Sequence, residues 1–268
     1  MRKLESPQAI RTIFFDAGFT LLRTSPSLVE ICQDVCRREG VRLDIEQIAQ
    51  QLPAAEAYFA KAIKSNGRTW ASEEAIILFW DGYYKALLRP CIEGDNEALL
   101  ERCAQEIIKT FDLHTSWELY PDVLPTLQGL QGRGFTLGII SDWGGSLASI
   151  IAGLDLPRYF DCLTISAVTR HAKPEPGLYE LALRRAGGIS DYAIHIGDSY
   201  ILDVLGARAV GITPILIDRP GHLRAQEMDC LVIHDLREVL DLLDISTAPA
   251  VHAATPEQQH YQGDRLES

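Results

Sequence analysis

The sequence is poor in basic residues: 25 Lys and Arg stand against 37 Asp and Glu, which gives a formal net charge of −12 at pH 7. Because nucleic-acid binding depends on clustered Lys and Arg, this balance disfavours a polyanionic partner. Long hydrophobic runs are also missing, and no stretch reaches the roughly 20 apolar residues of a membrane span. The N-terminal residues lead directly into a hydrophobic strand, so we expect no signal peptide. We therefore expect a cytoplasmic protein with neither a nucleic-acid nor a membrane partner.

The six cysteines do not form a C-x-x-C pair, the spacing that is typical of zinc and redox sites. Cys32 and Cys36 lie four residues apart beside Leu28, Ile31 and Val35, which together make an apolar stripe at helical spacing. Buried free thiols explain this pattern better than metal ligands do.

The chain of 268 residues is long enough for one large domain or for a domain with an insert. A hydrophobic strand is predicted over 11–16, and the segment 24–112 that follows has an almost wholly helical pattern. Ser25 before Pro26 predicts the start of one helix and Ser72 the start of another, and a third runs from about Asn96 to Phe111.

From about residue 120 the pattern changes to alternating strands and helices. Further buried strands are predicted over 135–141, 162–166, 193–196 and 214–217. This alternation predicts an α/β fold with a Rossmann-like, parallel, five-stranded sheet covered by helices on both faces. The predicted division is an α/β core (1–23 and 113–245), an inserted helical domain (24–112) and a disordered, polar, Ala/Pro-rich tail (246–268).

Polar residues follow several of the predicted strands. Asp16 follows the first strand, Ser141 and Asp142 stand at the end of the second, Lys173 lies in the loop after the third, and Asp198 follows the fourth. The carboxyl ends of parallel strands lie on one edge of the sheet, where ligands bind. We therefore expect carboxylates, a hydroxyl and an ammonium group to meet in one crevice.

These residues belong to four motifs, in an order that resembles the haloacid dehalogenase-like (HAD) hydrolase superfamily, subfamily I, whose members carry a helical (C1) cap. The motifs are Ile13–Leu21, Gly138–Asp142, Lys173–Pro176 and His195–Asp203 with its continuation to Gly211. The resemblance covers about 11–218, and it implies that 24–112 is the cap.

The resemblance implies that Asp16 is a nucleophile that forms an aspartyl-phosphate, which water then hydrolyses. Lys173 would hold both this carboxylate and the phosphate as a compact cation. Thr20, Ser141 and Asp142 would bind the phosphoryl group.

The resemblance also implies a Mg²⁺ cofactor, a hard cation that prefers oxygen ligands. Its implied ligands are Asp16, the backbone carbonyl of Gly18 and Asp198. Asp203 would act indirectly, either through water or by orienting its neighbours.

Three positions depart from the family pattern. Gly18 stands where family phosphatases usually have a second Asp that protonates the leaving group, and such acid–base help is worth about 10²- to 10⁴-fold. Phe19 replaces a common Gly, and Asp142 replaces a frequent Asn. Metal binding is therefore expected to survive, while acid catalysis is weakened.

Three functions are open. The first is a Mg²⁺-dependent phosphohydrolase, monomeric or homodimeric, that acts on a small phosphorylated metabolite. It is either slow on ordinary monoesters or prefers substrates whose leaving group needs no protonation, such as acyl phosphates. The second is a changed reaction: dehalogenation, which Asp198 disfavours, or phosphonate cleavage, which needs a cap lysine such as Lys61, Lys64 or Lys85. The third is a catalytically impaired protein that binds phosphate compounds or another partner.

Three further residues are candidates for places near the crevice. His195 is expected to be a core or near-site histidine rather than a catalyst, and His171 precedes Lys173 by two residues. Trp143 either presents an aromatic face at the entrance or packs against the cap.

Overall fold

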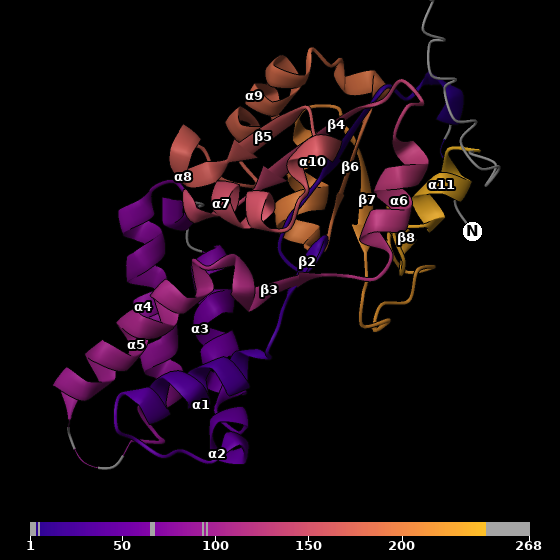
Figure 1. Cartoon of the computed structure of the whole chain (residues 1–268). Helices are drawn as coiled ribbons and strands as arrows, with labels where there is room; N and C mark the ends of the chain where they lie inside the picture. The colour runs from indigo at the N-terminus through magenta and orange to yellow at the C-terminus, as the bar shows by residue number, and fades with distance from the viewer. Residues whose placement is uncertain (1–3, 5, 65–67, 93, 95, 245–268) are drawn as a thin grey trace, which may run out of the picture.

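The computed structural model describes residues 4, 6–64, 68–92, 94 and 96–244. The tail predicted over 246–268 lies outside these residues. Figure 1 shows a sheet with helices on both sides, and a group of helices from the first half of the chain that gathers at one end of it. In the described part of the chain, no helix combines the length and the apolar character needed to cross a membrane.

The α/β part is built on a six-stranded parallel sheet with the strand order β5-β4-β1-β6-β7-β8. The central strand β1 pairs with β4 on one side and β6 on the other, so Phe15 lies opposite both Ile139 and Ile196. This architecture confirms the predicted α/β, Rossmann-like class. The strands are β1 (Thr12–Phe15), β4 (Thr136–Ser141), β5 (Cys162–Ile165), β6 (Ala193–Gly197), β7 (Thr213–Ile217) and β8 (Leu231–Ile233).

The predicted count of five strands is wrong, because β8 adds a sixth. This strand spans three residues and pairs with β7 at the edge of the sheet, with Val232 opposite Leu216. A segment this short does not reveal a strand periodicity. Its assignment depends on the pairing with β7, which the sequence does not show.

Helices cover both faces of the sheet, as the buried strands require. Residues of α6 (Val123–Leu130), α7 (Ser146–Gly153) and α11 (Glu238–Leu242) pack into the hydrophobic cluster on one face. The other face is covered by α9 (Pro176–Ala186) and α10 (Leu205–Ala209). A short helix, α8 (Ser166–Thr169), follows β5, and a π-helical turn, Tyr200–Val204, precedes α10.

The regular elements described between β2 and β3 are all helices, and the buried apolar residues of this segment form a hydrophobic cluster separate from those of the sheet. Its helices are α1 (Leu28–Arg38), α2 (Ile45–Ala49), α3 (Leu52–Lys64), α4 (Glu73–Leu88) and α5 (Glu97–Phe111). Ser72 and Asn96 cap α4 and α5 as expected, but the first helix begins later than predicted, because Ser27 rather than Ser25 accepts the capping hydrogen bond. The division into separate domains stays a prediction. The thiols of Cys32 and Cys36 are free and buried in α1.

A short antiparallel pair, β2 (Leu22–Thr24) and β3 (Trp117–Leu119), joins the two ends of the helical segment. Arg23 and Glu118 on these strands form an ion pair of 2.7 Å. Because β2 begins six residues after Asp16, the helical segment that follows β2 starts close in sequence to the predicted nucleophile.

Candidate active site

The carboxyl edge of the sheet brings the predicted polar residues to neighbouring strand ends. Asp16 follows β1, Ser141 ends β4 and is followed by Asp142, and Asp198 follows β6. After β1 the chain adds β4 and β5 on one side of β1, and then β6, β7 and β8 on the other, so the strand order reverses at β1. In open α/β sheets, ligands bind at such a point.

Lys173 occupies the centre of the site and is buried, with 1% of its surface exposed. Its Nζ lies 2.5 Å from Asp16 Oδ1 and 2.6 Å from Asp203 Oδ1. Burial by itself would lower the pKa of Lys173, but Asp16 and Asp203 outweigh it and raise this pKa well above its usual value. A buried cation of this kind is stable only because carboxylates surround it.

Asp203 joins Lys173 to His195. Its Oδ1 lies 2.8 Å from His195 Nε2, and its Oδ2 accepts a hydrogen bond of 3.0 Å from the backbone N–H of Ser199. Burial opposes ionisation, yet Lys173 and His195 hold the pKa of Asp203 well below its ordinary range. A Cβ atom at position 197 would lie 2.1 Å from the Asp203 carboxyl carbon, so Gly197 is required for this arrangement.

His195 is fully buried on β6, and burial lowers its pKa. A neutral imidazole donates Nε2–H to Asp203, and the ring of Tyr179 contacts it edge-on at 5.3 Å. Its Nδ1 is buried and has no hydrogen-bond partner among the described residues. The histidine therefore lies near the site and contacts it through Asp203.

The side chain of Asp142 contacts the loop that carries Lys173. Asp142 Oδ1 accepts a hydrogen bond of 3.0 Å from the backbone N–H of Lys173. Burial raises the pKa of Asp142 to about 7, against the opposing charge of Lys173. Ser141, one residue earlier, is buried at the end of β4. Asp142 thus ties β4 to the lysine loop in addition to any contact with a substrate.

Thr20 is fully buried, and its hydroxyl has no partner within the described residues. Its backbone carbonyl accepts a hydrogen bond of 2.5 Å from Arg219, which also pairs with Asp122 at 2.5 Å and lies 4.0 Å from the centre of the Tyr120 ring. Sequence reasoning did not identify Arg219 or Asp122. The position of Arg219 in the sequence could have indicated it, because Arg219 stands two residues after β7 and so lies at the same edge of the sheet.

Gly18 lies next to the ring of Trp143. A Cβ atom at position 18 would be 3.1 Å from Cζ3 of Trp143, closer than a comfortable contact. Phe19 follows with a left-handed backbone (φ 56°) and a side chain that is 53% exposed. Both features are unusual for a large aromatic residue. An aromatic ring therefore borders position 18, where family phosphatases usually have a second Asp.

The backbone around Trp143 is held by several contacts. Its N–H donates a hydrogen bond of 3.1 Å to the Ser166 hydroxyl, and its carbonyl accepts one of 3.3 Å from the N–H of Ala167. Its ring meets that of Trp117 edge-on at 4.7 Å. Two residues later, the N–H of Gly145 donates a hydrogen bond of 2.9 Å to Glu73 of α4, so the helical segment contacts the same loop.

Comparison with known proteins agrees with this arrangement. A model of the haloacid dehalogenase-like hydrolase family matches residues 10–211, which include all four motifs. The chain belongs to the haloacid dehalogenase-like hydrolase family.

Several HAD-like relatives cover most of the chain. It is 27% identical over 210 residues to the haloacid dehalogenase-like hydrolase domain-containing protein 3 of Danio rerio, covering 78% of this chain and 86% of the relative. It is 26% identical over 246 residues to the phosphoserine phosphatase of Thermus thermophilus, covering 86% and 98%. The HAD-hydrolase YfnB of Bacillus subtilis, solved with bound magnesium, has a similar fold, with a TM-score of 0.67, 19% identity and coverage of 88% and 99%.

The predicted metal ligands of this HAD-like hydrolase are two carboxylates and a backbone carbonyl. Burial raises the pKa of Asp16 to about 6. The side chain of Asp198 is more exposed, and partial desolvation together with the nearby charges of Asp16 and Asp203 raises its pKa. A cation would relieve this crowding of negative charge, and all the donors are oxygens, so the set fits Mg²⁺. In the described ranges, no group of three His, Cys, Asp or Glu side chains is placed to hold a metal. Both oxygens of Asp203 already bind protein groups, which favours its orienting role over an indirect metal role.

The remaining candidates lie outside this cluster. His171 is exposed and packs against position 177 at the start of α9. Of the lysines considered for phosphonate cleavage, Lys85 forms ion pairs with Asp81 and Glu101, and Lys61 is exposed. The side chain of Lys64 lies outside the described parts.

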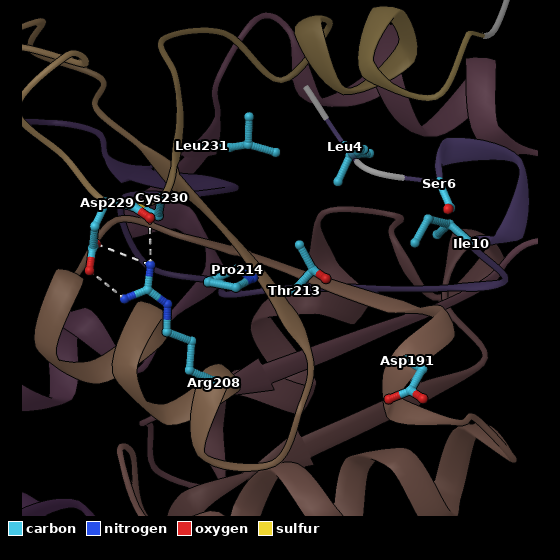
Figure 2. Close-up of a pocket in the computed structure, with 10 residues that line it drawn as sticks. All are labelled: Leu4, Ser6, Ile10, Asp191, Arg208, Thr213, Pro214, Asp229, Cys230 and Leu231. Carbon is cyan, nitrogen blue, oxygen red and sulfur yellow. Dashed lines mark hydrogen bonds and ion pairs between the residues drawn. The ribbon is translucent and has the colours of Figure 1, made fainter. Parts of the chain in front are cut away.

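A cavity of about 420 Å³ lies at the opposite, amino edge of the sheet. Figure 2 shows Arg208 on one side of it, bonded to Asp229, and Asp191 on another, with Pro214 and Thr213 between them in this view and the apolar Leu4 and Ile10 above. Thr213 at the start of β7 marks the edge of the sheet on which this cavity lies. The cavity is therefore separate from the site around Asp16.

Proposed function

We propose that the protein is a phosphohydrolase that cleaves a small phosphorylated metabolite through an aspartyl-phosphate at Asp16, with Mg²⁺ as cofactor. The observation that carries this proposal is the buried Lys173, paired with Asp16 at 2.5 Å and with Asp203 at 2.6 Å at the carboxyl edge of the sheet. The likeness to a bacterial phosphoserine phosphatase supports the reaction class, and the magnesium bound by YfnB supports the cofactor.

The first step of the proposed reaction is attack by Asp16 on phosphorus. Lys173 holds Oδ1, so we assign the attack to Oδ2 of the ionised carboxylate. A bond forms between this oxygen and phosphorus, the bond from phosphorus to the leaving group breaks, and the departing oxygen keeps the electron pair. Lys173 fixes the orientation of the carboxylate and balances the charge of the phosphoryl group.

In the second step, water attacks phosphorus and breaks its bond to Asp16. The carboxylate is regenerated, inorganic phosphate leaves, and the proton released from water neutralises the departed group. When bound by Asp16, Asp198 and the Gly18 carbonyl, Mg²⁺ would neutralise the phosphate charge. We assign Ser141 and Thr20 to hydrogen bonds with phosphoryl oxygens, and Asp142 to holding the Lys173 loop beside them.

Gly18 supplies no proton to the leaving group. We therefore infer a preference for groups that depart without protonation, such as the carboxylate of an acyl phosphate. The helical segment 24–112 is assigned as the cap, and the protein as a cytoplasmic monomer or homodimer without nucleic-acid or membrane partners.

The test is phosphate release from acetyl phosphate and p-nitrophenyl phosphate, with Mg²⁺ and with a chelator. We expect Mg²⁺-dependent turnover that Asp16→Asn abolishes. A matched control, Asp155→Asn, changes an exposed aspartate in the loop after α7 and should leave turnover intact.

Other outcomes identify the alternatives. Equal inactivity of wild type and Asp16→Asn on a broad panel of phosphate compounds, together with measurable binding of those compounds, would show a catalytically impaired binding protein. Chloride release from 2-chloropropionate without metal would show a dehalogenase.

A further inference from the structure

The residues on the two sides of Asp16, which we call its two flanks, differ in how much of their surface is accessible. One, the charged flank, consists of Lys173, Asp203 and His195, which are all buried, with at most 2% of each residue exposed. Their polar atoms contact one another, so no organic group can pack among them. The other, the aromatic flank, consists of Gly18, Phe19 and Trp143.

The aromatic flank is accessible where the charged flank is closed. Gly18 and Trp143 are partly exposed, and Phe19 is 53% exposed, whereas Ala17 between Asp16 and Gly18 is fully buried. Asp16 itself is buried, with 7% of its surface exposed, so this accessible surface begins two residues after the nucleophile. Trp143, two residues beyond β4, contacts position 18, so its ring borders the turn that follows the nucleophile.

Trp143 is also a rigid surface. Hydrogen bonds to Ser166 and from Ala167 fix its backbone, and the edge-on ring of Trp117 supports its indole at 4.7 Å. A large ring that is already held in place costs little conformational entropy when a ligand packs on it. Phe19 adds an exposed aromatic side chain on a strained backbone, a combination that occurs where a residue serves function.

We propose that Trp143 is a specificity-determining residue that receives the organic part of the substrate, so that the protein selects phosphate compounds with a planar, apolar departing group. Aryl phosphates and aromatic acyl phosphates are the classes that fit. This proposal rests on the proposed function, because Asp16 defines the position of the phosphoryl group. Two cations at this edge, Lys173 and Arg219, are engaged by carboxylates.

The first experiment measures binding without turnover. Titration calorimetry compares benzylphosphonate with ethylphosphonate, which share the anionic group and differ in the aromatic ring. We expect wild type to prefer the benzyl compound by about 3- to 10-fold, as for an aromatic contact. Trp143→Leu should remove this preference and Trp143→Phe should keep most of it.

A matched control is Tyr192→Leu, which removes an exposed aromatic ring just before β6, at the opposite edge of the sheet. It should leave the preference unchanged. Thermal unfolding of each variant checks that the binding change does not arise from loss of the fold.

The second experiment compares kcat/KM for benzyl phosphate and ethyl phosphate, which both release poor leaving groups. Trp143→Leu should lower the ratio of the two values by the same factor as in binding. An unchanged ratio in both experiments would overturn the assignment of Trp143. If acetyl phosphate and p-nitrophenyl phosphate are not turned over either, but the binding preference appears and depends on Trp143, the proposed function fails while the aromatic contact is supported.

Discussion

The charged and aromatic flanks of Asp16 use opposite chemistry at one strand end. On the charged flank, Lys173 pairs with two carboxylates, and His195 fixes one of them. On the aromatic flank, a glycine and the ring of Trp143 occupy the position where a proton donor is expected. The charged flank therefore holds the proposed nucleophile in place, while the aromatic flank offers no carboxylate to protonate a leaving group.

The largest expected effect comes from breaking the charged flank with Lys173→Met. Turnover of p-nitrophenyl phosphate should fall by about 10²- to 10³-fold, because a fixed charge at the phosphoryl group is lost. Stability should also fall by about 3 kcal/mol, since Asp16 and Asp203 would face each other without a cation. Steady-state kinetics and urea unfolding measure both. A variant with wild-type turnover would contradict the role of Lys173.

His195 tests whether the charged flank acts as one unit. His195→Leu removes the hydrogen bond to Asp203, and bonds to charged groups are worth about 1.5–3 kcal/mol. We expect kcat to fall by about 10- to 30-fold with little change in KM, because Lys173 and Asp16 lose their fixed orientation while the binding surface remains. His195→Gln, which can still donate to Asp203, should recover much of kcat. Equal losses in both variants would indicate a packing role only.

Asp142 links the charged flank to β4 and makes stability depend on pH. Its folded-state pKa of about 7 lies above the ordinary value of 3.8 for an aspartate, so the native state holds a proton that the unfolded state releases first. The stability contributed by this group is therefore present below about pH 4 and is lost as the pH rises toward 7. Lys173, Asp16 and Asp203 are the charged groups that act on it.

Asp142→Asn imitates the protonated form and can still accept from the Lys173 N–H. In the presence of a chelator, we expect the variant to be more stable than wild type by about 2 kcal/mol at pH 8 and equal to it at pH 4. Chemical unfolding at both values measures the difference. A constant difference between the two pH values would contradict the raised pKa.

The smallest expected effect comes from restoring a carboxylate on the aromatic flank. Gly18→Asp alone should gain little, because its Cβ would lie 3.1 Å from the Trp143 ring. In the Gly18→Asp/Trp143→Leu double variant, turnover of ethyl phosphate should rise by up to about 10-fold relative to Trp143→Leu, with a smaller gain on acetyl phosphate. An equal gain on both substrates would show that the carboxylate does not act as an acid.

Much of the fold could be predicted because its signals are local. Apolar runs predicted five of the six strands, and Ser72 and Asn96 marked the helices that they cap. The exceptions have physical reasons. β8 is too short to show a period, and both Ser25 and Ser27 are suitable capping residues, so only the backbone geometry selects Ser27.

The site was predictable where chemistry follows a strand end, as for Asp16, Asp142 and Asp198. The site was harder to predict where a side chain acts through another residue. The Asp142 contact with the Lys173 loop joins positions 31 residues apart, and the Arg219 contact with Thr20 joins positions 199 apart. Such contacts leave no periodic pattern in the sequence.

The sequence by itself determined the parallel α/β architecture, the order of the four motifs and the absence of a carboxylate at position 18, because these depend on residue type and short-range spacing. Only the tertiary structure decided that Lys173 is buried between Asp16 and Asp203, and that Trp143 lies next to Gly18. These contacts arise because the parallel sheet brings the ends of β1, β4 and β6 together. Distance along the chain does not encode that proximity.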